Sequence, residues 1–364
     1  MTSAEIIHWL LTEGRLCTSS PELLKKFGTL LEVELGCDRV WLGTSVLHPQ
    51  AAGYVWFYEE GTIRERIFSY EEDALLQNID SPAIRLKNGV NEIHLQAPDA
   101  DGMQDVEDLF NRGYVDFFAL SFFFQGKWSG GITYSSRTPF TQEKIDILRA
   151  INPAISAVVE PLTCRLVTST LLETYLGADA GRRVFLGQVK RGDGQTLRSV
   201  IWFSDIRGFT RMSERLELNQ LLETLNSAFE QVVKAVEANG GQVLKFIGDG
   251  LLAVFPCDQG DAQACEAARK AATQLSSNLS EVEVGVGLHL GDVNYGNIGA
   301  PGRLDFTVIG SDVNLAARVE SQTGKLGQMM LATPAVAKHG SWKAIEKVSL
   351  KGVAQPVVLY APND

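Results

Sequence analysis

The hydrophobic positions of residues 1–160 predict a sheet with helices at both ends. Two segments near the start have the 3.6-residue spacing of an amphipathic helix, and a third such segment begins at Thr141. Runs rich in valine, isoleucine and aromatic residues between them favour strands. The expected helices are 3–11 and 21–35, and the expected strands are 39–47, 53–58, 63–69, 115–124 and 128–135. This part of the chain therefore reads as a small α+β domain.

The pattern of hydrophobic and polar positions changes after residue 160. Residues 161–196 read as a linker that is helical up to Leu176 and then rich in glycine and charge. From residue 197 to residue 364 the order of elements is strand, helix, strand, strand, helix, strand, which is the ferredoxin-like βαββαβ arrangement. The expected elements are strand 199–203, helix 214–238, strands 242–247 and 251–255 around a Gly-Asp-Gly turn, helix 261–279 and strand 283–290. The whole chain is expected to be an α+β protein of two domains.

Composition and charge narrow the classes of function. The chain has 364 residues and a formal net charge of −11, so no general positive field exists to hold nucleic acid or an anionic membrane. The longest apolar run, 115–124, is about half of the roughly 20 residues that a membrane helix needs. The five cysteines form no CxxC pair and their number is odd, which favours a reducing compartment. We expect a cytoplasmic protein without nucleic-acid or membrane partners.

The chemistry is expected at two aspartates. Asp205 ends the first strand of the second domain, and Asp249 lies at the tip of the central hairpin, so the topology predicts that the two carboxylates converge. Two carboxylates suit a pair of Mg²⁺ or Mn²⁺ ions that also bridge substrate phosphates. Taken singly, Asp205 could cap the following helix and Asp249 could be an ordinary turn residue.

The residues around the two aspartates carry a family resemblance. The segments read FSDIRGFT at 203–210, KFIGDG at 245–250, FTVIG at 306–310 and VNLAAR at 313–318. These segments resemble, in order and spacing, the motifs of class III adenylate and guanylate cyclases. The resemblance covers 197–364 and implies a catalytic domain that closes a cyclic nucleotide with two metal ions. It also implies a homodimer, because in this family each site lies between two catalytic domains.

The resemblance also implies a role for each residue of the site. Asp205, Asp249 and the carbonyl of Ile206 would bind the metals, and the backbone near Phe209 and Thr210 would face the terminal phosphates. Asn314 would orient the ribose and Arg318 would stabilise charge at the α-phosphate. Lys351, in a Leu-Lys-Gly segment, would hold the triphosphate, although these three residues could also be an exposed strand end.

The purine is expected to be adenine. Lysine only donates hydrogen bonds, so Lys245 suits the N1 acceptor of adenine, and Thr307 can accept from the 6-amino group. Guanylate cyclases of this family usually have glutamate and cysteine at these positions. The threonine hydroxyl can also donate, so a guanylate or mixed-specificity cyclase stays an alternative, as does a silent dimerisation module. The segment 310–314 reads GSDVN where the family more often has GDTVN, a difference that the sequence alone does not explain.

The end of the first domain carries a second resemblance. The strand 130–133, the segment 137–141 and the helix after it resemble the end of a GAF domain, a small-molecule sensor with helices flanking an antiparallel sheet. This resemblance implies a regulatory domain with a small-molecule ligand. Helix 154–176 would then be a transducer, although a passive linker fits the same residues.

Overall fold

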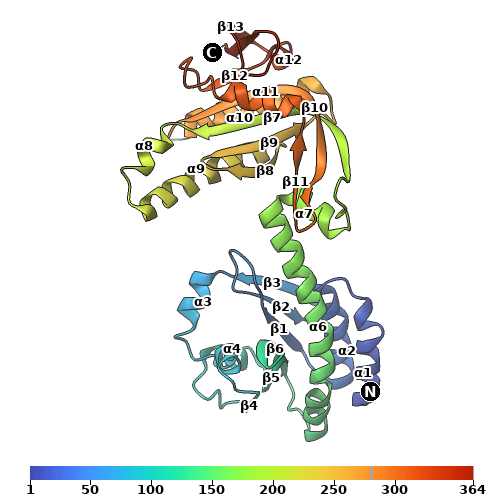
Figure 1. Ribbon diagram of the computed structural model, residues 1–364. Helices are drawn as coiled ribbons and strands as arrows, with labels where there is room; N and C mark the ends of the chain where they lie inside the picture. The colour runs from blue at the N-terminus through green and yellow to red at the C-terminus, as the bar shows by residue number, and fades with distance from the viewer. Residues whose placement is uncertain (279–281, 364) are drawn as a thin grey trace. The chain divides into compact units, whose positions relative to one another are not determined.

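The computed structural model of this chain describes residues 1–278 and 282–363. The chain divides into two compact units, Met1–Leu171 and Leu172–Asp364 (Figure 1). Each unit has its own sheet and its own hydrophobic cores, and each is described here by itself.

The first unit is built on a six-stranded sheet whose neighbouring strands are all antiparallel, in the order β3-β2-β1-β6-β5-β4. Its strands are β1 Arg39–Ser45, β2 Gly53–Glu59, β3 Thr62–Phe68, β4 Glu92–Gln96, β5 Asp116–Phe124 and β6 Lys127–Ser136. Its helices are α1 Ser3–Leu11, the 3₁₀ turn η1 Gly14–Leu16, α2 Ser20–Leu35, α3 Tyr70–Leu76, α4 Pro82–Lys87, α5 Gln104–Asn111 and α6 Gln142–Leu176.

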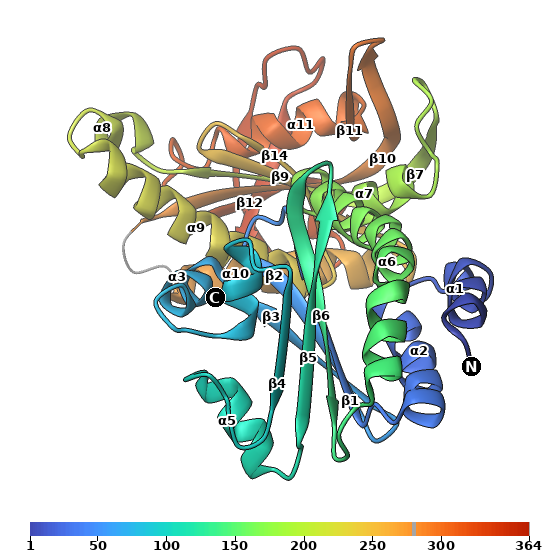
Figure 2. The same ribbon diagram turned by 90° about the horizontal axis from the view of Figure 1, so that it is seen from below.

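Helices cover both faces of this sheet (Figures 1 and 2). On one face, α1, α2 and α6 bury apolar side chains against the sheet, including Leu10, Phe27 and Leu148. On the other face, α4 and α5 form a smaller core with β5, around Leu86 and Val106. Burial of apolar surface on both faces is the main free-energy gain that holds a sheet between helices.

The sequence predicted most of these elements. Helix 3–11 is confirmed, helix 21–35 begins one residue earlier because the Ser19 side chain caps it, and the five predicted strands lie within two residues of their expected bounds. The helices α3, α4 and α5 and strand β4 were missed. They are short and polar, so their apolar positions are too few to show a period.

Helix α6 is the longest helix of the described chain. By length and composition alone, it is the one helix among the described residues that could cross a membrane. Its first half packs Ile145, Ile151 and Val158 into the core of the first unit, an arrangement also typical of a soluble core helix.

The second unit is built on an 8-stranded sheet, ordered β13-β14-β12-β10-β7-β9-β8, with β11 paired to β10. Its strands are β7 Gly194–Ile206, β8 Gln242–Ile247, β9 Gly250–Pro256, β10 Val284–Ala300, β11 Arg303–Ile309, β12 Met330–Ala332, β13 Trp342–Val348 and β14 Val357–Pro362. Its helices are α7 Ala178–Phe185, α8 Phe209–Ser213, α9 Leu218–Ala238, α10 Asp261–Asn278, α11 Ser311–Glu320 and α12 Pro334–Ala337. The predicted βαββαβ order is present from β7 to β10.

Two sets of helices cover this second sheet. Helices α9 and α10 pack on one face around Trp202 and Phe255, whereas α7 and α11 contribute Ala180 and Ala316 to a core with β11. The central strand β7 lies between β10 and β9, so its end at Asp205 is held from both sides. A central strand with two neighbours is a rigid support for a site.

Three expected bounds in this unit need correction. Helix 214–238 begins only at Leu218, as α9, because Glu217 is extended, and the separate helix α8 precedes the predicted range. Strand 283–290 continues to Ala300, since its second half pairs with β7 and β11. The linker after Leu176 contains helix α7, stabilised by an Arg183–Asp179 ion pair of 2.6 Å. The last residue of predicted helix 261–279 lies outside the described residues.

Candidate active site

Asp205 and Asp249 lie side by side in the second unit, as the sequence predicted. Asp205 is the penultimate residue of β7, and Asp249 lies in the two-residue turn between β8 and β9. Strands β7 and β9 pair antiparallel with Asp205 opposite Gly250, the residue after Asp249. The register of the sheet thus brings both carboxyl groups to one place.

Glycine at position 250 makes this approach possible. A β-carbon there would lie 2.8 Å from the Ser204 carbonyl oxygen and 3.2 Å from Oδ1 of Asp205. The neighbouring Gly248 has φ of 63°, in the left-handed region that glycine adopts without strain. The Gly-Asp-Gly turn therefore places Asp249 close to Asp205 and keeps the space around Oδ1 open.

The pair of carboxyl groups is electrostatically unfavourable without a cation. Burial raises the pKa of Asp205 to about 6, and the adjacent Asp249 carboxylate adds to the rise. No group of three or more His, Cys, Asp or Glu side chains in 1–278 and 282–363 could hold a metal ion. Two carboxylates suit Mg²⁺, which is commonly bound by one or two carboxylates together with substrate phosphates.

A third acid, Glu320, lies behind this pair and was missed in the sequence. It ends helix α11, and its Oε1 would lie 3.1 Å from a β-carbon at Gly285, the residue of β10 that pairs with Asp205. Burial raises the pKa of Glu320 to about 7, and the charge of Asp205 contributes. No motif marked Glu320, because its position depends on how α11 crosses the sheet.

Lys245 has a partner that the sequence did not reveal. Its Nζ lies 2.6 Å from Oδ2 of Asp305, across the contact between β8 and β11. Asp305 precedes Thr307 by two residues on β11, so both side chains leave the same face of that strand. The ion pair therefore places the Lys245 ammonium on the Thr307 side of β11, with further N–H groups available to a ligand.

Thr307 carries a polar atom without a partner. The residue is 6% exposed, and its Oγ1 is buried with no hydrogen bond to any residue in the described chain. Phe306 and Val308, its neighbours on β11, point into the core. A buried hydroxyl without a partner is costly in a folded protein, and a hydrogen-bonding ligand would remove that cost.

Asn314 and Arg318 lie one turn apart on helix α11, as their spacing predicted. Neither side chain forms a hydrogen bond or ion pair with another residue of the described chain. Arg318 reaches the loop that contains Lys351, because its Nη2 is 3.7 Å from the β-carbon position of Gly352. The structure thus places the predicted ribose, α-phosphate and triphosphate residues at neighbouring positions.

The start of α11 is anchored by Asp312. The Asp292 backbone N–H donates to Oδ2 of Asp312 at 2.9 Å, and Oδ1 lies 3.5 Å from Nε2 of His289. Both partners belong to β10. Asp312 therefore fixes the first turn of α11, two residues before Asn314, which gives a physical role to the unusual GSDVN segment.

The remaining predicted residues surround the aspartates. Ile206 follows Asp205 at the end of β7 and is buried in the core, while its carbonyl belongs to the strand end. Phe209 and Thr210 begin the five-residue helix α8, where Phe209 packs against the core and Thr210 is exposed.

The structure does not join the two halves of the predicted site within one chain. Asp205 and Asp249 form one group, and the Lys245, Asp305 and Thr307 side chains form another. No hydrogen bond or ion pair connects the two groups in the described part of the chain. Each group presents polar atoms that can bind a substrate, so the geometry is that of two partial sites.

Residues 195–360 match the family model of the adenylate and guanylate cyclase catalytic domain. These residues of the second unit are a cyclase catalytic domain of this family. The four motif segments and the aspartate pair of this cyclase domain all lie within the matched residues.

Curated relatives match the cyclase domain and little else. The chain is 33% identical over 192 residues to an adenylate cyclase of Anabaena cylindrica, an alignment that covers 47% of this chain and 38% of that protein. It is 29% identical over 189 residues to the terminal-differentiation-specific adenylate cyclase of Dictyostelium discoideum, covering 48% of this chain and 9% of that protein. The chain spans about a third of the length of the first curated relatives that it matches.

Solved structures of adenylyl cyclases also match parts of this chain. The adenylyl cyclase CyaB from P. aeruginosa is 28% identical with a TM-score of 0.43, over 47% of this chain and 96% of that chain. A bacterial light-regulated adenylyl cyclase is 21% identical with a TM-score of 0.49, over 75% of this chain and 93% of that chain.

Proposed function

We propose that the cyclase domain converts ATP to cyclic AMP and pyrophosphate. The observation that carries this proposal is the arrangement of Lys245 and the unpartnered Thr307 hydroxyl on one side of β11. A fixed donor beside a hydroxyl that can accept matches N1 and the 6-amino group of adenine. Two relatives of the domain, from Anabaena and Dictyostelium, are named as adenylate cyclases.

The reaction is attack of the ribose 3′-oxygen on the α-phosphorus. The new bond joins O3′ to phosphorus, the bond to the pyrophosphate oxygen breaks, and the 3′-hydroxyl proton passes to water or to a substrate phosphate. In this proposal Asn314 orients the ribose, Arg318 stabilises the charge that develops at the α-phosphate and Lys351 holds the triphosphate. The backbone near Phe209 and Thr210 would face the terminal phosphates.

Asp205, Asp249 and the Ile206 carbonyl would hold Mg²⁺ or Mn²⁺, two ions per site. Bound divalent ions neutralise phosphate charge and lower the pKa of the attacking hydroxyl. The chain contributes the placement of both carboxylates by the β7–β9 register and the turn at Asp249. Their mutual repulsion, seen in the raised pKa of Asp205, is relieved when a cation is shared.

We further propose that the active form is a homodimer with two equivalent sites. The aspartates of one chain would face Lys245, Thr307, Asn314 and Arg318 of the other. Exposed apolar side chains on β8 and β11, which carry Lys245 and Thr307, and on α9 support this arrangement. They are Leu218 and Leu222 on α9, Phe246 and Ile247 on β8, and Leu304 and Ile309 on β11. An apolar surface beside a partial site is typical of an interface between subunits.

The first unit would be a GAF-like regulatory domain. Its six-stranded antiparallel sheet with helices on both faces supports this interpretation. The five cysteines are free in the structure, and ATP is an intracellular substrate, so we place the protein in the cytoplasm. Helix α6 would connect the sensor with the catalytic domain as a transducer.

Supplying ATP and GTP separately tests the proposed reaction. The purified full chain should release cyclic AMP from ATP with Mg²⁺ or Mn²⁺, identified by chromatography against authentic nucleotides. Asp205→Asn should abolish turnover, whereas Asp258→Asn, a change at an exposed turn of the same unit, should leave it intact. Cyclic GMP as the main product would support the guanylate cyclase alternative, and no product from either nucleotide would support a silent domain.

A further inference from the structure

The first unit contains a cavity that the proposed reaction does not use. Its volume is about 410 Å³, within the range of small-molecule sites. The walls come from β1, β2 and β3 and from the helices α3, α4 and α5, so the cavity lies on the sheet face opposite α1 and α2. Aromatic side chains form much of the lining: Trp41, Phe57, Phe117 and Trp128.

Arg39 is the most unusual group in the wall. Its Nε is buried without a hydrogen-bond partner, and its guanidinium lies over the Phe57 ring at 5.0 Å. No carboxylate lies within 4.0 Å of it in the described chain. Burial lowers the pKa of Arg39, because the guanidinium has lost water and the more distant Glu59 carboxylate only partly opposes that shift.

The other cations of the wall already have acids. Lys87 pairs with Asp73 at 3.0 Å, Arg66 with Glu72 at 3.8 Å, and Arg112 with Glu59. Arg39 is therefore the wall cation whose charge is left for a ligand. Its planar fork of N–H donors matches the two oxygens of a carboxylate.

A further polar atom in the lining has no protein partner. Nε1 of Trp128 is buried and unbonded in the described chain. Buried polar groups of native proteins are nearly always hydrogen-bonded. A ligand with an oxygen atom would provide a partner for this N–H.

The lining also favours a flat ligand. A β-carbon at Gly43 would lie 2.3 Å from the Trp41 ring, so the indole lies directly over the strand. With Phe57 and Trp128, it gives the cavity aromatic walls, which pack well against a planar ring.

The charges of the wall favour a ligand with a small negative charge. Arg66, Lys87 and Arg112 are each paired with an acid, which leaves Arg39 as the wall cation without an ion pair in the described chain. A monoanion suits this single cation, whereas a phosphate ester near two negative charges would also meet the wall carboxylates Asp73, Asp105 and Asp108.

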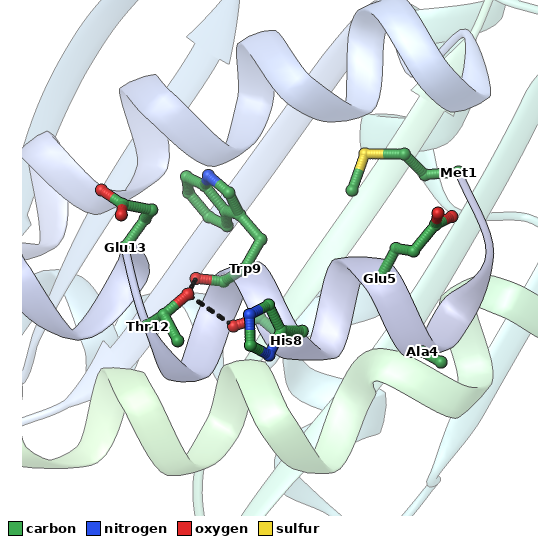
Figure 3. A pocket seen from close by; sticks show the side chains of 7 residues that line it. All are labelled: Met1, Ala4, Glu5, His8, Trp9, Thr12 and Glu13. Carbon is green, nitrogen blue, oxygen red and sulfur yellow. Dashed lines mark hydrogen bonds between the residues drawn. The ribbon is translucent and has the colours of Figure 1, made fainter.

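A second hollow of the first unit provides a contrast. Figure 3 shows it beside α1, with a volume of about 550 Å³. Its polar groups are already bonded: Thr12 Oγ1 donates to the His8 carbonyl at 2.8 Å, and Glu5 accepts from the Thr2 backbone at 2.7 Å. It has none of the unpartnered groups that distinguish the sheet cavity.

We propose that the cavity beneath α3, α4 and α5 binds a small organic carboxylate with a planar aromatic body. Arg39 holds the carboxylate, the Trp128 indole N–H donates to one of its oxygens, and Trp41 and Phe57 contact the ring. The proposal concerns the first unit alone and stands whether or not the second unit makes cyclic AMP.

Calorimetric titration of the full chain with 2-naphthoate tests the proposal. The matched probe 2-naphthylmethanol has the same rings without charge, and naphthyl phosphate carries a larger charge. We expect saturable binding of naphthoate, one per chain, roughly tenfold or more tighter than either comparison probe, because a charge-assisted bond to Arg39 is lost or opposed there. Equal binding of all three, tighter binding of the phosphate, or no binding would overturn the proposal.

Two single-residue variants test whether naphthoate binds at Arg39. Arg39→Gln should weaken naphthoate binding roughly tenfold or more and leave naphthylmethanol binding unchanged. Arg64→Gln, at an exposed arginine of β3 outside the cavity, is the matched control and should bind like the wild type. Unchanged naphthoate binding in Arg39→Gln would overturn the assignment.

Stability separates a ligand residue from a structural one. Without ligand, Arg39→Gln and Trp128→Phe should melt close to the wild-type temperature, because each removes a buried polar group that has no partner. Trp128→Phe should also weaken naphthoate binding severalfold while remaining folded, as judged by circular dichroism. A marked fall in melting temperature for both variants would show that these groups are structural and would overturn the proposal.

Discussion

The two units present their unpaired polar groups in different ways. In the first unit, Arg39 and Trp128 line a single cavity built by the sheet and helices of one chain. In the second unit, Asn314 is exposed and Arg318 half-buried on α11, without side-chain partners in the described chain. One chain surrounds the cavity in the first case, whereas in the proposed dimer a second copy would complete the site in the second case.

This difference indicates what could regulate each of the two proposed sites. A site enclosed by one chain responds to the concentration of its ligand alone. A site completed by a second copy also responds to how the copies are arranged. The four predictions that follow test or sharpen this contrast, beginning with the largest expected effect.

The largest effect is expected from mixing two inactive variants. Asp205→Asn and Arg318→Ala should each lose nearly all activity, because they damage opposite halves of the site. Equal mixing should restore about a quarter of wild-type activity, since half of the dimers are mixed and each has one intact site. Cyclic AMP production by the mixture measures this recovery.

A second mixture serves as the control. Asp205→Asn with Asp249→Asn damages the same half in both chains, so no dimer gains an intact site and no recovery is expected. Absence of recovery in the first mixture would mean that each chain carries a complete site and would remove the contrast between the units. Recovery in the control would mean that Asp205 and Asp249 of one site come from different chains, which would contradict the proposed halves.

The next effect concerns base selection. Lys245→Glu with Thr307→Cys should erode the preference for ATP over GTP by roughly 10² or more, because the hydrogen-bonding pattern is reversed. Asp305→Asn should raise KM for ATP roughly tenfold with a smaller change in kcat, since the Lys245 ammonium loses its anchor. Steady-state kinetics with both nucleotides measures these changes. ATP selectivity that survives the double change would contradict our account of the purine site.

A smaller effect is expected at Asp312. Asp312→Ala removes the acceptor for the Asp292 N–H and frees the start of α11, which carries Asn314. We expect kcat to fall severalfold while the melting temperature changes by only a few degrees. Asp312→Asn keeps an acceptor oxygen and should recover most of the loss. Equal kcat in the alanine variant and the wild type would mean that α11 needs no such anchor.

The smallest effect is on stability without metal. The pKa of Asp205 is raised to about 6 in the folded state, so folding favours its protonated form. That contribution is fully present below its ordinary pKa of about 3.9 and is lost as pH rises through about 6. Between these values the metal-free second unit should lose a few degrees of melting temperature, and Asp205→Asn should lose less.

Scanning calorimetry with a chelator, repeated with Mg²⁺ and a non-hydrolysable ATP analogue, measures this effect. Ligand should raise the wild-type transition and leave that of Asp205→Asn nearly unchanged. The transition of the first unit is the internal reference, because it contains no part of the aspartate pair. Identical pH dependence in wild type and variant would mean that the two carboxylates do not repel each other.

Local patterns in the chain were enough to predict many elements. Strand 199–203 and the hairpin around Asp249 follow from short runs of apolar residues and a Gly-Asp-Gly turn, which act over a few residues. The missed elements, α3 to α5 and β4, are short and are held by contacts with distant strands. Helix 214–238 was wrong at its start because nothing in its apolar spacing marks the break at Glu217.

The residues of the candidate site were also predicted only in part. The pairing of Asp205 with Asp249 was predicted, because one central strand and one hairpin suffice to bring them together. Asp305, Asp312 and Glu320 were missed, since each acts through residues that are 20 to 115 positions away in the chain, such as His289, Lys245 and Asp205. The cavity with Arg39 was also not predicted, since its walls come from eight separate elements, including β5 and β6.

The sequence by itself was enough to predict the family of the second unit and the aspartate pair, because motifs record chemistry at fixed short spacings. Only the tertiary structure decided which acid holds Lys245, what anchors α11 and which arginine of the first unit has no carboxylate. The physical reason is that pairing and burial depend on distances in space. A charge is costly or useful according to what surrounds it, and residues far apart in the chain provide those surroundings.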